Sequence, residues 1–113
     1  MAELVYVDVE DGKKRVMNNA KLYIRLLTKF KDETRIDPLF AALDEGDYAK
    51  AQELAHTIKG VSANLSIKEL AAKILELENQ IKAKAVQAET VEAVKACFTE
   101  TMKEVEKVVA ENA

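Results

Sequence analysis

The fold of this chain is first visible in the stretch AQELAHTIKGVSANL, residues 51–65. Its larger apolar side chains are spaced three or four residues apart, which is the period of one buried stripe on an α-helix. The stripe comprises Ala51, Leu54, Ile58, Val61 and Leu65. We therefore predict an amphipathic helix over about residues 48–64, with this stripe turned towards the core.

His56 is the only histidine of the chain, and it lies on the opposite face of this predicted helix. It is two positions from both Leu54 and Ile58, so at about 100° per residue it points away from the core. Lys59 lies one turn further on, at a spacing that makes helical neighbours. Gly60 follows, although glycine costs about 1 kcal/mol relative to alanine inside a helix. We expect the missing side chain to permit close approach by another molecule, with tight packing against a neighbouring helix as the alternative.

Three elements are predicted before this helix. A capping segment covers about residues 1–17, in which Asp8 can cap a short helix. A longer helix then covers about residues 19–32. The pair Asp37-Pro38 starts a short third helix, because proline suits the first helical position, and Gly46 ends it.

Two helices are predicted after residue 64. Ser66 and Glu69 have the spacing of a capping box for the first of them. One unbroken helix from residue 67 to residue 111 would be about 67 Å long at 1.5 Å per residue, so we place a turn near residues 84–88. The two apolar stripes are Ile67, Leu70, Ile74, Leu77 and Ile81, and then Val91, Val94, Phe98, Val105 and Val108.

Helices that each carry one apolar stripe must pair those stripes, and short connections favour antiparallel neighbours. The predicted class is therefore all-α, an up-and-down antiparallel four-helix bundle capped by the short first and third helices. A length of 113 residues suits a single domain over residues 1–113.

Composition and charge exclude several classes of function. The net charge of −3, with no basic stripe, argues against nucleic-acid binding. No apolar run approaches the roughly 20 residues that span a bilayer, so we expect no membrane partner. One cysteine, Cys97, and no evident signal peptide favour a cytoplasmic protein.

The exposed histidine narrows the chemistry further. One histidine and one cysteine cannot build a typical zinc site, and no glycine-rich phosphate loop indicates ATP binding. Nothing in the sequence supplies the oxyanion hole or the orienting acid of an acyl-transfer site. An exposed imidazole is mostly neutral at pH 7 and can act as a nucleophile. Phosphoryl transfer therefore fits best, with His56 as acceptor and Lys59 neutralising charge on the phosphoryl oxygens.

The segment Ala55-His56-Thr57-Ile58-Lys59-Gly60 resembles the core of the histidine-containing phosphotransfer (HPt) domains of multistep two-component phosphorelays. That core has a small residue, histidine, any residue, an aliphatic residue, lysine and glycine. The resemblance extends upstream over residues 22–27 and downstream over residues 70–78. Many family members carry a second glycine where this chain has Ser66.

The resemblance implies a phosphocarrier without kinase activity of its own. His56 would take a phosphoryl group from a receiver-domain aspartate or a hybrid sensor histidine kinase and pass it to another receiver. Lys59 would stabilise the group, and the receiver would bring Mg²⁺, so no cofactor or metal is expected on this chain, which we expect to be a monomer. The implied docking residues are Gln52, Ala55, Thr57, Gly60 and Ala63.

Two other functions remain open at this point. A helical adaptor would bind a receiver or another signalling protein without phosphotransfer. A coiled-coil oligomerisation module would use the apolar stripes of the last two helices.

Overall fold

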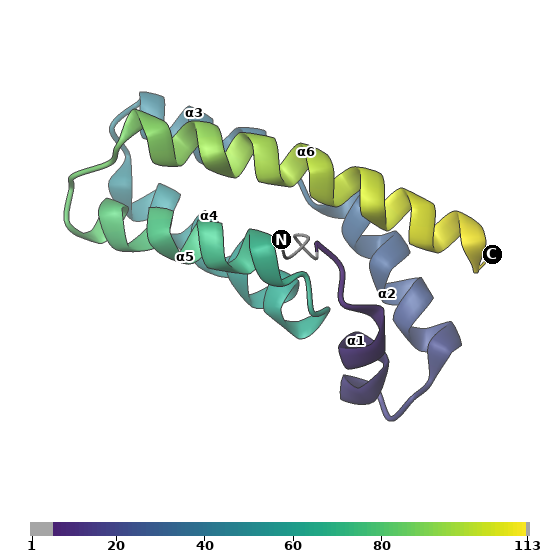
Figure 1. The fold of residues 1–113 in the computed structure, drawn as a ribbon. Coiled ribbons are helices and arrows are strands. Elements are labelled where there is room, and N and C mark those ends of the chain that lie inside the picture. The colour runs from purple at the N-terminus through teal and green to yellow at the C-terminus, as the bar shows by residue number, and fades with distance from the viewer. Residues whose placement is uncertain (1–5, 113) are drawn as a thin grey trace, which may run out of the picture.

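The computed structural model describes residues 6–112, which form helices and no strand (Figure 1). The all-α class is therefore confirmed for this part of the chain. The first five residues of the predicted capping segment lie outside the described residues. The helices are α1 (Val9–Arg15), α2 (Ala20–Glu33), α3 (Asp37–Asp44), α4 (Tyr48–Asn64), α5 (Lys68–Lys82) and α6 (Ala88–Glu111).

Local capping explains where several of these helices begin. The side chain of Asp8 accepts a hydrogen bond from the Asp11 amide at the start of α1. Asn19 and Asp47 cap α2 and α4 in the same way. Gly46, with φ +74°, occupies the left-handed region just before that last cap, where glycine avoids the steric penalty of a side chain. The bounds of α4 agree with the predicted helix over residues 48–64.

Ser66 differs from its predicted role as an N-cap. The N-cap of α5 is Ile67, which makes no side-chain hydrogen bond to the helix. Ser66 has φ +59°, and its hydroxyl donates to Asp11 Oδ2 at 2.5 Å, while its carbonyl accepts from the Asp8 amide at 3.0 Å. The left-handed turn thus directs its side chain to α1 instead of α5, and the serine ties α1 to the α4–α5 turn.

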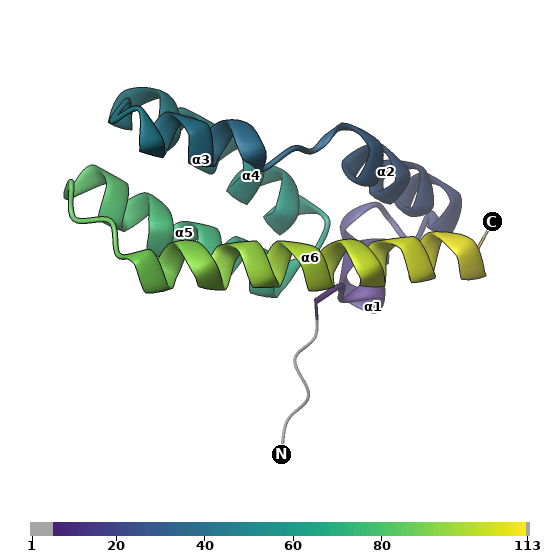
Figure 2. The same cartoon turned by 90° about the horizontal axis from the view of Figure 1, so that it is seen from above.

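Helices α4 and α5 form the most extensive helix pair, joined by the turn at residues 65–67. Helix α5 also packs on α6, α3 packs on α4, and α2 packs on α6. Figure 2 shows α6 running the length of the molecule, with α5 beside its first half and α2 beside its second half. The predicted turn near residues 84–88 corresponds to residues 83–87 between α5 and α6. The up-and-down connectivity of a four-helix bundle stays a prediction.

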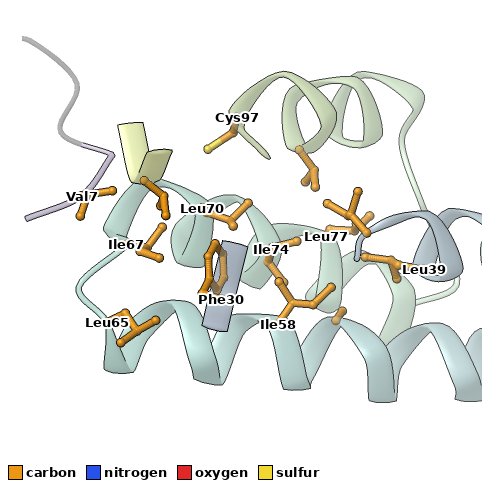
Figure 3. Close-up of a cluster of buried hydrophobic side chains, with 14 of the residues drawn as sticks. Val7, Phe30, Leu39, Ile58, Leu65, Ile67, Leu70, Ile74, Leu77 and Cys97 are labelled. Carbon is orange, nitrogen blue, oxygen red and sulfur yellow. The ribbon is translucent and has the colours of Figure 1, made fainter. Parts of the chain in front are cut away.

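The apolar stripe of α5 lies in the core, where side chains from several helices converge (Figure 3). This burial removes the basis for a coiled coil on α5, because its stripe already packs within the chain. No helix among residues 6–112 is long and apolar enough to cross a membrane. The buried stripe residues of α5 and the residue before it are Ile67, Leu70, Ile74, Leu77 and Ile81.

The buried face of α4 is rotated relative to the predicted stripe. It centres on Ala51, Ala55, Ile58 and Ser62, whereas Val61 is 39% exposed. The hydroxyl of Ser62 is buried without a hydrogen-bond partner among the described residues, so its small size is what suits the position. Small side chains on this face allow α4 to pack closely against a neighbouring helix. The packing between helices, and not the position of the larger apolar side chains, therefore decides which face of α4 is buried.

A buried tyrosine links α2 to the end of α4. Tyr23 is fully buried, and its hydroxyl donates to the Leu65 carbonyl at 2.7 Å. Burial, together with the nearby charges of Asp8 and Asp11, raises the pKa of Tyr23 to about 12. The phenol therefore stays protonated in the folded chain at pH values where it ionises in the unfolded chain.

Replacing Tyr23 by phenylalanine is expected to lower the free energy of unfolding by about 1 kcal/mol at pH 7, because the Leu65 carbonyl loses its buried donor. The pKa of Tyr23 in the folded chain lies above the ordinary value of about 10 for an exposed tyrosine. The linked stability is therefore present below pH 10 and is lost as the pH rises towards about 12. The variant should lose less stability over that window than the unaltered chain. Urea unfolding from pH 7 to 12 measures this, and parallel pH profiles would contradict it.

Candidate functional site

His56 lies in the second half of α4, and its side chain is 69% exposed. The outward orientation predicted from the helical spacing is therefore present. One edge of the imidazole is nevertheless close to the neighbouring helix, because Nδ1 lies 3.4 Å from Oε2 of Glu78 on α5. The other ring nitrogen, Nε2, has no such partner among the described residues.

Glu78 is the residue that the sequence analysis missed. Its side chain is only 2% exposed, yet it is charged and faces three basic groups. Oε1 accepts a hydrogen bond from Lys59 Nζ at 2.8 Å, and Oε2 lies 3.6 Å from Lys82 Nζ as well as near His56. Lys59 on α4 and Glu78 on α5 are 19 residues apart in the sequence, and the buried carboxylate of Glu78 joins the two helices.

Charge around Glu78 decides its protonation state. Burial is the largest single influence and opposes ionisation, but the hydrogen bond and charge of Lys59 and the charges of Lys82 and His56 outweigh it. The pKa of Glu78 is lowered as a result, and the carboxylate is ionised at neutral pH. A carboxylate beside Nδ1 favours the tautomer with its proton on Nδ1, which leaves the Nε2 lone pair free towards solvent.

Lys59 is oriented by Glu78 while remaining next to the histidine. Its side chain is 26% exposed, and its ammonium is held at the α4–α5 junction. With Lys82 it contributes two positive charges against the one negative charge of Glu78. These three groups together carry one positive charge, which suits the binding of an anionic group to the ring.

Gly60 lies one turn after His56, and no close packing within the chain requires it. A Cβ placed on Gly60 would meet no atom within 4 Å. The alternative of tight packing against a neighbouring helix is therefore wrong among the described residues. The surface beside His56 is open, as close approach by another molecule requires.

The other predicted docking residues divide into two groups. Gln52, Thr57 and Ala63 are exposed or half-buried. Ala55 is fully buried, which contradicts its predicted place on a docking surface. The reason is the rotation of α4, because Ala55 belongs to the small-residue face that packs in the core.

One comparison with known proteins gave a match. The sequence profile described as Hpt domain matches residues 25–107. This range includes most of α2, the whole of α3, α4 and α5, and most of α6, with His56, Lys59 and Glu78 inside it. Comparisons with curated proteins and with solved structures found no match.

Proposed function

The chain belongs to the Hpt domain family, and on that premise we propose that it carries phosphoryl groups on His56. The family indicates involvement in two-component phosphorelay signalling, in which Hpt domains are phosphocarrier modules and not kinases. In our proposal His56 takes the group from a receiver aspartate, or from a hybrid sensor histidine kinase, and passes it to another receiver. The observation that carries the proposal is the exposed imidazole with its Nδ1 against buried, ionised Glu78.

The reaction needs no group on this chain beyond those described. The Nε2 lone pair of His56 attacks the phosphorus of the aspartyl phosphate, a P–N bond forms, and the P–O bond to the aspartyl carboxylate breaks. The carboxylate leaves with the bonding electrons. The ring becomes positively charged while Nδ1 keeps its proton, and Glu78 stabilises that charge at 3.4 Å. Transfer to the next receiver is the reverse reaction.

Lys59 has a second effect in this proposal. Its ammonium neutralises part of the charge on the phosphoryl oxygens while Glu78 limits its movement. We expect the Mg²⁺ for the reaction to arrive with the receiver, so that this chain needs no cofactor. A cytoplasmic location and a monomeric state complete the proposal.

Incubating the chain with a receiver domain that is phosphorylated on its aspartate tests this function. We expect label to enter the chain, to be lost in acid, to survive alkali, and to map to the peptide containing His56. The competing function is a helical adaptor that binds the receiver without chemistry. Binding of several phosphorylated receivers to the folded chain with no label in it would favour the adaptor.

Replacing Glu78 by glutamine is expected to slow phosphotransfer about tenfold, equivalent to about 1.4 kcal/mol in the barrier. The neutral amide stabilises the charged ring less and also loses the preference for a proton on Nδ1. Nitrogen chemical shifts of the imidazole measure the tautomer directly, and rapid-quench kinetics measure the rate.

Glu76→Gln is the matched control, because Glu76 is an exposed glutamate on the same helix. It should change neither the tautomer nor the rate. A purely structural role for Glu78 would lower stability in Glu78→Gln while leaving the tautomer preference and the rate per folded molecule as they were. That outcome would remove Glu78 from the mechanism.

A further inference from the structure

The turn between α1 and α2 carries the most exposed large apolar side chain among residues 6–112. Met17 is 91% exposed, whereas Leu75 and Val61 are 45% and 39% exposed. Figure 1 shows this turn at an outer edge of the molecule, at the end opposite to α3 and to the turn between α5 and α6. Met17 therefore adds nothing to the core, and its side chain is presented to solvent at one end of the fold.

The backbone holds Met17 in this position at a conformational cost. Met17 and Asn18 both have left-handed backbones, with φ +57° and +60°. Asparagine tolerates this region, whereas a methionine has no short polar group to form a compensating local hydrogen bond. The amide of Asn18 donates to the carbonyl of Lys13 at 2.7 Å and fixes the turn. A methionine that neither packs nor suits its backbone indicates a contact outside the chain.

Basic side chains flank Met17 on both sides. Residues 12–25, which we call the basic turn, contain five basic residues and no acidic one in a chain whose net charge is −3. Arg15 is paired with Asp11, but the other four form no salt bridge among residues 6–112. The overall charge therefore conceals a local excess of positive charge at the end that carries Met17. The five basic residues are Lys13, Lys14, Arg15, Lys21 and Arg25.

An exposed apolar side chain among unpaired cations is the combination that suits an anionic bilayer surface. Such contacts use apolar side chains that enter the boundary between headgroups and acyl chains, and lysines or arginines that lie among anionic headgroups. A nucleic acid carries phosphates for the cations but offers no continuous apolar layer for the methionine. The expectation of no membrane partner rested on the absence of a spanning apolar run, and a surface contact needs no such run.

We propose that the basic turn binds the surface of an anionic lipid bilayer. Met17 enters the boundary between headgroups and acyl chains, and the unpaired cations contact lipid phosphates. The contact is peripheral and reversible, because one side chain enters the bilayer and the remaining attraction is electrostatic and screened by salt. It does not depend on phosphotransfer, since His56, Lys59 and Glu78 lie on α4 and α5, outside the basic turn.

Flotation of the full chain with lipid vesicles tests the binding. We expect the chain to float with vesicles of equal parts phosphatidylcholine and phosphatidylglycerol, to remain unbound with phosphatidylcholine alone, and to dissociate as the ionic strength rises. Met17→Gln and Lys14→Gln should each weaken binding to the anionic vesicles by about five- to tenfold. The matched controls are Leu75→Gln and Lys50→Gln, which change exposed residues outside the basic turn and should bind as the unaltered chain does.

Tryptophan fluorescence locates the contact, because the sequence contains no tryptophan. The emission of Met17→Trp should shift to shorter wavelength on anionic vesicles, and that of Leu75→Trp should not. Absence of flotation would overturn the proposal. Flotation without a shift in Met17→Trp, or with equal affinity in all four glutamine variants, would place the contact elsewhere and also overturn it. A shift with a DNA duplex and none with vesicles would assign the basic turn to nucleic acid instead.

Discussion

A chain with His56 replaced by glutamine is expected to take up no phosphoryl label, from a phosphorylated receiver or from phosphoramidate. His56 is the only histidine, and an amide nitrogen has no available lone pair for attack on phosphorus. The loss should exceed a thousandfold, down to the background of the assay. Because the side chain is 69% exposed, the substitution removes no core packing, and the free energy of unfolding should change by less than about 0.5 kcal/mol.

Binding to the receiver supplies the control for this variant. His56→Gln should still bind, because glutamine leaves the exposed and half-buried docking residues Gln52, Thr57, Gly60 and Ala63 unchanged. Acid-labile label in the variant would place the acceptor on another side chain and contradict the proposal. An adaptor would instead show the same binding and the same signalling output with glutamine as with histidine.

The placement of His56 was predictable because local features determine it. Asp47 caps α4, and three- and four-residue spacing orients the helix well enough to turn residue 56 outwards. The same local logic placed the start of α3 at Asp37-Pro38. In each case the deciding contacts lie within about one helical turn, where sequence patterns carry the most information.

Glu78 shows where local patterns fail. It follows Ile74 by four residues and precedes Ile81 by three, so a charged residue occupies the buried stripe of α5. That position was a usable signal of an unusual role. Its partner Lys59, however, is 19 residues away on another helix, and only the packing of α4 on α5 brings the two together.

The rotation of α4 and the left-handed conformation of Ser66 both depend on contacts between residues that are far apart in the sequence. Small residues such as Ala55 and Ser62 are fully buried, although a hydrophobic pattern gives them little weight. Ser66 bonds to Asp11, 55 residues away, and so leaves the local N-cap position. Its left-handed backbone is a conformation that glycine would adopt without the steric cost of a side chain.

Replacing Gly12 by alanine is expected to destabilise the chain by about 2 kcal/mol, or roughly 10 °C in Tm. A Cβ on Gly12 would overlap the ring of Tyr23. That ring is fully buried and its hydroxyl is bonded to the Leu65 carbonyl, so displacing it is costly. Either the ring shifts and breaks this bond, or α1 separates from α2. The free-energy cost of either route exceeds the gain in helix propensity that alanine brings over glycine.

Gly60→Ala is the matched substitution, and it should act in the opposite direction. A Cβ there meets nothing within 4 Å, so the helix gains about 1 kcal/mol of stability from alanine's higher propensity. The new methyl lies on the open surface one turn after His56, where it should slow transfer to the receiver but not labelling by phosphoramidate, a small phosphoryl donor. Thermal unfolding, transfer to the receiver and labelling by phosphoramidate, each measured on both variants, test the pair. Gly12→Ala should transfer normally per folded molecule, because Gly12 lies on α1 and its clash is with Tyr23 and not with a residue of the His56 site. Equal destabilisation by both alanines, or faster transfer by the Gly60 variant, would contradict the prediction. In the proposed function Gly60 is kept for the approach of a partner although it lowers helix stability, whereas Gly12 is required by the packing of α1 on α2.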